Sequence, residues 1–270
     1  MAYPDGVAER VLDELGIRDP KDLLLLEEIA YVRGATVVDR PLRGMEARIT
    51  IIGKRAVISV SDTVRSVSRR RYSIAHELGH FEMHRSESSL SLCTEKDIGD
   101  EAAEISKGRE QEANAFAASL LMPRRFFKPL CQASEPSIDA IADLARVFST
   151  SLTATGIRYT QFTKEAAVLV FSQAGVVRWF KGSGAFDDLE LYIPVGERLE
   201  KGTLAFSCYH TGTVSRAPKR VAASAWVDSA SCRPGAKILE HSTPILGNDG
   251  VLTMLWIDDD ILDEDYYDQT

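Results

Sequence analysis

Hydrophobic and polar positions repeat with two different periods along the chain. Before about residue 162, most apolar side chains recur every three or four positions, as on one face of a helix. After about residue 163, apolar and polar side chains alternate, as on the two faces of a strand. The change of period predicts a largely helical N-terminal part followed by a β-rich C-terminal part.

Helices are expected in the first part wherever apolar residues keep the helical spacing. The expected ranges are 7–33, 68–84, 101–122, 138–148 and 152–162. Asp19-Pro20 marks a new helix start inside the first range, and Gly34 and Pro123 mark helix ends. The last two helices, joined by residues 149–151, form a helix-turn-helix-like pair.

Strands are expected in two regions. Residues 35–60 are rich in β-branched residues with turns at Gly44 and Gly53, which predicts two or three antiparallel strands. In the C-terminal part, turn signals at residues 173–175 and 248–250 separate the alternating segments. These segments are 167–171, 176–180 and 251–257, and they predict an antiparallel sheet with few helices.

Together these elements predict an α+β fold in three parts. The first is a mainly helical domain with a small antiparallel sheet over residues 1–130. The helix-turn-helix-like segment follows over residues 131–162. An antiparallel β-rich domain is expected over residues 163–270, and it ends in an acidic tail.

Composition narrows the functional classes. With 44% hydrophobic and 27% charged residues and no apolar run near the roughly 18 residues that cross a bilayer, the chain is not expected to enter a membrane. Its N-terminus lacks the basic start and apolar stretch of a secretory signal, so we expect a cytoplasmic protein. The four cysteines lie at least 24 positions apart, which favours reduced thiols over a disulfide framework.

Charge argues against a nucleic-acid binder. The net charge is −8, but residues 258–270 hold seven acids and no base, so the remainder carries only −1. Because a nearly neutral body lacks the basic signature of such proteins, we do not expect direct nucleic-acid binding. The arginines at positions 65, 69, 70 and 71 are interpreted as a solvated face rather than a phosphate site.

The main chemical signal is the pentapeptide His76-Glu77-Leu78-Gly79-His80. Histidines four positions apart project from one face of a helix and can bind one Zn²⁺, while the glutamate between them reaches a water on that ion. Chance expects about 0.007 copies of this HExxH pattern in a chain of this composition. The pattern therefore predicts a metal site with Glu77 as its catalytic residue.

A third ligand is needed, because catalytic zinc sites usually have three protein ligands and one open position. His84 stands eight residues after His76, about 12 Å along a helix, so it cannot reach the same ion. The expected helix over residues 101–122 is a better source, since it contains Glu110 and Glu112. Glu110 shares a helix face with Asn114, but spacing alone leaves the choice between the two carboxylates open.

Two segments carry a family resemblance. Residues 71–81, RYSIAHELGHF, are followed by residues 110–123, EQEANAFAASLLMP. This pair resembles the ImmA/IrrE family of zinc metallopeptidases, and the resemblance extends over roughly residues 5–160. It implies a zincin-like metallopeptidase domain over residues 1–130.

The resemblance also implies the ligand set and a function. Zn²⁺, or another divalent metal such as Mn²⁺, would be held by His76, His80 and Glu110, with Glu112 as the alternative ligand. Asn114 would support the site from outside the ligand set, and Tyr72 is expected to be a core anchor. The implied activity is cleavage of a protein substrate, an XRE-type helix-turn-helix repressor, which would release stress-response or mobile-element genes.

A DNA-binding regulator with a non-catalytic zinc site is the alternative function. It would use the helix pair at residues 138–148 and 152–162. The second helix offers mainly Thr, Ala and Gly before Arg158, which are weak groups for reading base edges. We therefore interpret the pair as a packing element and retain the peptidase hypothesis.

Overall fold

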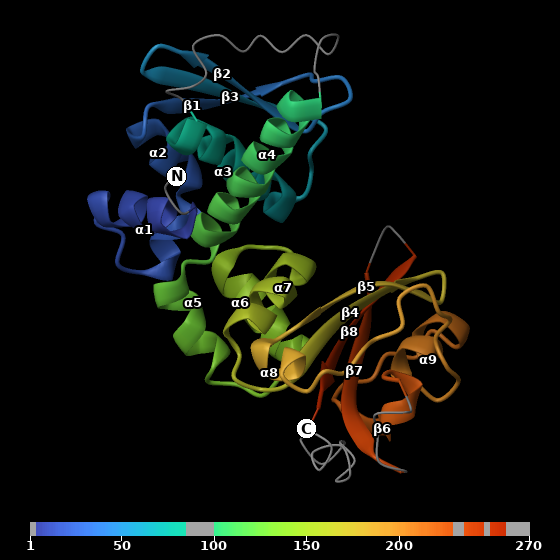
Figure 1. Cartoon of the computed structure of the whole chain (residues 1–270). Helices are drawn as coiled ribbons and strands as arrows, with labels where there is room; N and C mark the ends of the chain where they lie inside the picture. Colours follow the sequence, from blue (N-terminus) through green and yellow to red (C-terminus); the bar gives the residue numbers. More distant parts are fainter. Residues whose placement is uncertain (1–3, 85–99, 229–234, 246–248, 258–270) are drawn as a thin grey trace. The chain divides into compact units, whose positions relative to one another are not determined.

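The computed structural model describes residues 4–84, 100–228, 235–245 and 249–257, so the acidic tail expected from the sequence lies outside the described residues. The chain forms two compact units (Figure 1). One comprises residues 1–127 and 145–151, and the other comprises residues 128–144 and 152–270. The division into three domains at residues 130 and 162 stays a prediction.

The N-terminal helical region consists of three short helices. These are α1 (Pro4–Glu14), the 3-10 helix η1 (Pro20–Leu24) and α2 (Leu26–Val32). The single helical range expected over 7–33 is therefore interrupted, because Gly16 adopts a φ of 67° and Asp19 caps a new start at Lys21 N–H. Gly34, with a φ of 93°, follows the end of α2 as expected.

Three strands form the first sheet, in the order β1-β3-β2. They are β1 (Ala35–Arg40), β2 (Ala47–Ile52) and β3 (Arg55–Ser61). The β2–β3 hairpin is antiparallel, but β1 runs parallel to β3, so the expected fully antiparallel sheet is wrong for this pair. The reason is that residues 41–46 carry the chain across about two strand spacings, roughly 10 Å, and leave room for β3 between β1 and β2.

Two long helices, α3 (Val67–His84) and α4 (Asp100–Leu121), pack side by side, and α3 also packs on the first sheet (Figure 1). Both helices agree with the expected ranges to within one residue, and Pro123 follows the end of α4. Their backbones come close at Gly79. A Cβ there would lie 3.0 Å from Phe116 Cδ1 and 3.2 Å from the backbone of Ala113.

Three more helices stand between α4 and the second sheet in the sequence. They are α5 (Arg124–Cys131), which the sequence analysis missed, α6 (Ile138–Phe148) and α7 (Leu152–Phe162). The last two have the expected bounds. In α7, Gly156 allows close packing on the second sheet, since a Cβ there would lie 2.8 Å from a methyl carbon of Leu169.

The C-terminal sheet has the order β5-β4-β8-β7-β6, and each pair of neighbours is antiparallel. This confirms the antiparallel sheet expected for the C-terminal region. Its strands are β4 (Ala167–Gln173), β5 (Val176–Gly182), β6 (Lys219–Ala222), β7 (Lys237–Ile245) and β8 (Gly250–Trp256). Three short helices accompany it: α8 (Gly184–Asp187), α9 (Leu204–His210) and η3 (Ala223–Ala225).

The strand β7 contains polar residues that are fully buried. The Glu240 carboxylate accepts hydrogen bonds from Ala205 N–H at 2.7 Å, Ser242 Oγ at 2.8 Å and Trp226 Nε1 at 3.0 Å. Three donors offset the cost of removing this group from water. The buried carboxylate therefore links β7 to the first turn of α9 and needs no ligand to explain it.

The crossing at Gly79 predicts a stability difference between two helical glycines. Gly79→Ala forces the α3 and α4 backbones apart, whereas Gly108→Ala places its methyl group in open space. Since both changes gain helix propensity, we expect Gly79→Ala to be less stable by about 1–3 kcal/mol than Gly108→Ala. Urea unfolding in the presence of EDTA measures the difference without a contribution from bound metal. Equal free energies of unfolding would contradict a tight crossing.

Candidate metal centre

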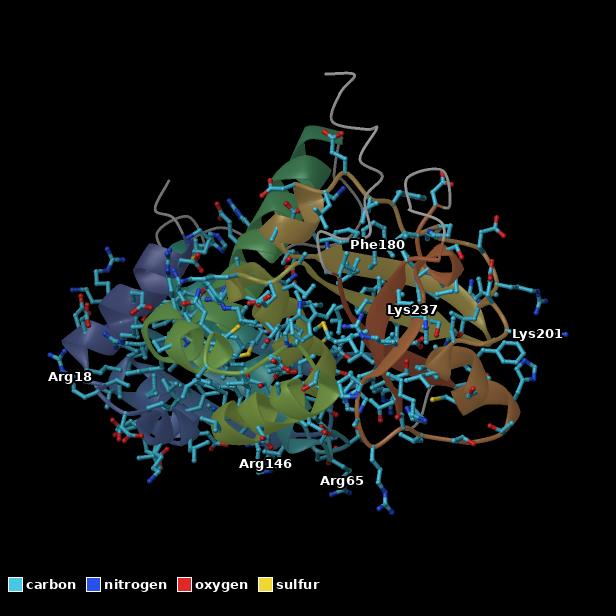
Figure 2. All side chains as sticks on the ribbon, turned by 90° about the horizontal axis from the view of Figure 1, so that it is seen from below. Arg18, Arg65, Arg146, Phe180, Lys201 and Lys237 are labelled. Carbon is cyan, nitrogen blue, oxygen red and sulfur yellow. The ribbon has the colours of Figure 1, made fainter. Side chains whose placement is uncertain are left out.

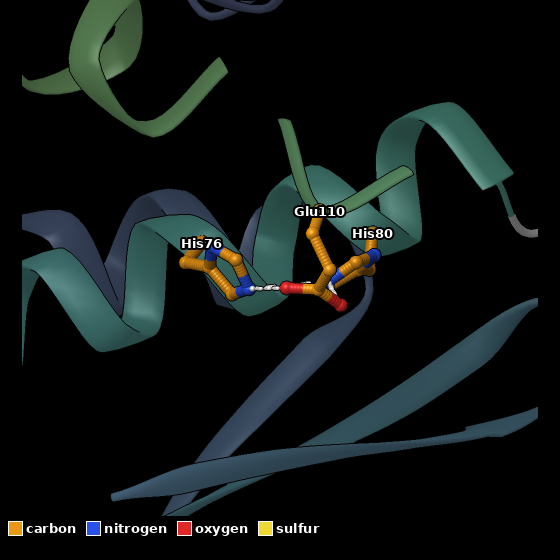
Figure 3. Close-up of side chains that lie close together, drawn as sticks. All are labelled: His76, His80 and Glu110. Carbon is orange, nitrogen blue, oxygen red and sulfur yellow. Dashed lines mark hydrogen bonds and ion pairs between the residues drawn. The ribbon is translucent and has the colours of Figure 1, made fainter. Parts of the chain in front are cut away.

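The two histidines of the HExxH motif direct the same ring nitrogen to one point. Both lie on α3, and His76 Nε2 is 3.1 Å from His80 Nε2 (Figure 3). The edge-on arrangement of the rings, with centroids 4.8 Å apart, follows from their spacing of one helical turn. The local helix therefore provides a pair of nitrogen donors.

Glu110 of α4 completes a three-donor cluster. Its Oε2 lies 3.2 Å from His76 Nε2 and its Oε1 lies 3.3 Å from His80 Nε2. The carboxylate points into the space between the two imidazoles (Figure 3). Within the part of the chain that the structure describes, these are the three residues whose donor atoms gather as a metal site would require.

The donor set fits a divalent metal such as zinc. Tetrahedral zinc with bonds of about 2.0–2.1 Å to nitrogen and oxygen keeps its ligand atoms about 3.3 Å apart. The two nitrogens here are 3.1 Å apart, and one ligand atom from each of the three residues can be chosen so that all lie within 4.8 Å of one another. Two imidazoles and one carboxylate also form one of the known three-ligand sets of catalytic zinc.

Burial of the His80 imidazole favours its neutral form. Burial lowers the pKa of His80 to about 4, although the charge of Glu110 acts in the opposite direction. A neutral imidazole carries one lone pair, which is what a metal ligand requires. His80 therefore needs no deprotonation before it binds a metal ion at pH 7.

Asn114 orients His76. Its Oδ1 lies 2.9 Å from His76 Nδ1 and accepts a hydrogen bond of 2.5 Å from the Tyr72 hydroxyl. An amide oxygen is only an acceptor, so His76 Nδ1 is the nitrogen that donates to Asn114, and Nε2 is the nitrogen that faces Glu110. Asn114 thus contacts a candidate ligand, and its supporting role stays a prediction. Tyr72 is half-buried beside the site rather than a core anchor, which corrects the sequence interpretation.

Glu112 is not part of the three-donor cluster. Its Oε2 lies 2.8 Å from His84 Nε2, and His84 Nδ1 lies 3.3 Å from His80 Nδ1. The structure thus brings Glu112 near the site through His84. The sequence analysis excluded His84 as a ligand because its side chain could not reach the ion. It missed the contact between His84 and His80, although their spacing of four residues indicates a shared helix face.

Glu77 lies at the edge of a cavity of about 560 Å³. His76, Tyr72 and Asn114 line the same cavity, together with residues of the β1–β2 loop. Burial, with a contribution from the charge of Glu110, raises the pKa of Glu77 to about 7, while a backbone hydrogen bond from Ile49 opposes the shift. A carboxylate of that basicity can exchange protons near neutral pH.

The arginine cluster is largely bound by the protein itself. Arg69 pairs with Glu46, Arg70 pairs with Glu27 and Asp39, and the buried Arg71 donates to the carbonyl oxygens of Leu23 and Leu24. The exposed Arg65 side chain extends outward (Figure 2). Three of the four guanidinium groups therefore already have acceptors, and the buried Arg71 does not belong to the solvated face that the sequence predicted.

Comparison with known families gave a match that covers the candidate metal centre. Residues 32–160 match a peptidase family described as the IrrE N-terminal-like domain. The match confirms the family resemblance of the two motifs and supports a metallopeptidase-like role. A comparison with curated proteins gave no match.

Among solved structures, a Mycobacterium tuberculosis transcriptional regulator resembles the chain. The TM-score is 0.57 with 18% identity, over 96% of this chain and 76% of that chain. At this identity the likeness shows a shared fold. It supports the mixed α and β architecture described above.

The arrangement predicts different effects for the two neighbouring carboxylates. Glu110→Ala removes one of three donors, so we expect the variant to lose the metal ion during gel filtration. Glu112→Ala leaves the donor set intact, so we expect about one ion per chain at saturating zinc. Elemental analysis of wild type and the two variants measures the stoichiometry. If Glu112→Ala loses zinc and Glu110→Ala keeps it, Glu112 is the third ligand instead of Glu110.

Proposed function

We propose that this chain, which belongs to the ImmA/IrrE family through its IrrE N-terminal-like domain, is a zinc-dependent endopeptidase. The observation that carries the proposal is the convergence of His76, His80 and Glu110 within one cluster, with Glu77 beside it at the edge of the cavity. A half-buried carboxylate next to a metal site in an accessible cavity is the arrangement that metal-assisted peptide hydrolysis requires.

In this mechanism Glu77 is the catalytic residue and the other three residues hold the metal. A bound zinc ion supplies Lewis acidity, which lowers the pKa of water toward 7 and polarises a carbonyl oxygen. Glu77 accepts a proton from the attacking water and later donates it to the leaving amine. The raised pKa of Glu77, about 7, suits a group that must both accept and release a proton.

The substrate that we propose is a helix-turn-helix transcriptional repressor of the XRE type. Its cleavage would release stress-response or mobile-element genes. The support for this substrate is the family resemblance, whose characterised members act on such repressors in the cytoplasm. Among the described residues no helix has the length and apolarity to span a membrane, and we place the protein in the cytoplasm as part of the proposal.

The alternative of a DNA-binding regulator has less support. In α7, which would enter the major groove, Thr155, Arg158 and Thr160 are all buried. Polar side chains that are buried in the protein cannot contact base edges. These residues favour the packing role that the sequence analysis assigned to the helix pair.

The proposal predicts the effect of removing the proton acceptor. Glu77→Gln keeps the size of the side chain, and we expect cleavage to fall by at least about 10²- to 10⁴-fold while zinc content stays near one ion per chain. The measurement uses candidate repressors encoded near the gene as substrates, with zinc analysis of the same preparations. Glu28→Gln, at an exposed position of α2, is the matched control and should cleave at the wild-type rate. Wild-type cleavage by Glu77→Gln would contradict the mechanism.

A further inference from the structure

The histidine at the end of α3 lies between a carboxylate and a proposed metal ligand. His84 is 6% exposed, its Nε2 lies 2.8 Å from Glu112 Oε2, and its Nδ1 lies 3.3 Å from His80 Nδ1. Both ring nitrogens therefore have polar neighbours in a site largely shielded from water. The mechanism above assigns no task to His84 or Glu112.

The hydrogen-bond chemistry of these groups places the protons. An ionised carboxylate can only accept, so His84 Nε2 donates to Glu112. When His84 is neutral its other nitrogen is an acceptor, and His84 Nδ1 can then accept from His80 Nδ1. In that arrangement the proton of His80 is held on Nδ1, and its lone pair is left on Nε2.

The nitrogen that keeps the lone pair is the one in the metal cluster. His80 Nε2 lies 3.1 Å from His76 Nε2 and 3.3 Å from Glu110 Oε1. The opposite tautomer would place a proton at the centre of the three donors and block coordination. His80 therefore has a tautomer requirement that the chain through His84 meets.

We propose that Glu112 and His84 form a relay that holds His80 in its metal-binding tautomer and orientation. This inference rests on the proposed function, because it assumes that His80 binds the metal. Glu112 and His84 are positioning residues, since neither belongs to the three-donor cluster. Their task matches that of Asn114 on His76, except that α4 contacts His76 directly and reaches His80 only through His84 of α3.

The direct test is zinc affinity of the full chain, measured by competition with a chelator. Loss of an orienting partner of a histidine ligand costs about 10–100-fold in metal affinity, so we expect losses of this size for His84→Phe and Glu112→Ala. Glu112→Gln keeps an acceptor oxygen, and we expect it to recover part of the loss. Gln111→Ala, at an exposed neighbouring position on α4, is the matched control and should bind as wild type.

Coupling between the two positions separates a relay from two independent structural effects. If Glu112 acts through His84, the double variant His84→Phe/Glu112→Ala should bind zinc as weakly as His84→Phe alone. If the loss of zinc affinity in the double variant equals the product of the two single losses, the relay is overturned. Should His84→Phe fail to fold, the Glu112 variants carry the test, since that side chain is 27% exposed.

A second readout reports the tautomer itself. ¹⁵N NMR of histidine-labelled, metal-free Glu110→Ala protein, in which no carboxylate faces His80 Nε2, distinguishes a protonated Nδ1 from a protonated Nε2, and the chain has five histidines to assign. We expect His80 to be protonated on Nδ1 in this Glu110→Ala background and to become a mixture of tautomers when Glu112→Ala is added. A His80 protonated on Nε2 in the Glu110→Ala background would overturn the relay.

The outcomes also separate this inference from the proposed function. A wild-type chain that binds no zinc would contradict the proposed peptidase. A wild-type chain that binds zinc, with unchanged affinity in His84→Phe and Glu112→Ala, would overturn the relay alone. Loss of affinity with the predicted coupling and tautomer change would support both.

Discussion

The candidate metal centre depends on the close crossing of α3 and α4 at Gly79. Because Gly79 has no side chain, the α4 backbone at Ala113 can approach to 3.2 Å from the place of a Cβ, a contact that would be tight for any other residue. Glu110 then reaches both histidines with a side chain of ordinary length. A wider crossing would leave two histidines and a solvated carboxylate, which together hold a metal ion much less well. The packing of the two helices thus determines whether the donors meet.

The geometry of α4 explains how one helix serves two histidines. With 100° per residue, Glu110 and Asn114 lie about 60° and 100° to one side of Ala113, and Glu112 lies about 100° to the other side. Glu110 and Asn114 therefore reach the part of α3 that contains His76 and His80, while Glu112 reaches His84. The pattern Glu-x-Glu-x-Asn in this segment follows from a helix that must contact its neighbour on both flanks of the crossing.

Local patterns predicted most of the elements, and long-range pairing accounts for most of what they missed. The period of apolar residues and Pro123 located α3, α4, α6 and α7, because these signals act within one or two turns. The parallel β1–β3 pair depends on where the chain returns after residues 41–46, which no local pattern states. The strand β7 was missed because Glu240 and its neighbours interrupt the alternation, and only tertiary contacts with Ala205 and Trp226 make their burial favourable.

At the metal site, too, local sequence patterns indicate some residues, and the rest become visible only in the folded structure. The spacing of His76 and His80 is dictated by metal geometry and is visible in sequence, whereas the choice of Glu110 needed a family resemblance before the fold placed its carboxylate between the imidazoles. Tyr72 and His84 lie one turn before and after the histidine pair, so helical spacing could have indicated them. Spacing alone could not show what they contact, because the contacts come from α4. Residues that bind a metal ion leave a pattern within one helix, and residues that orient them become recognisable only when a second helix is in place.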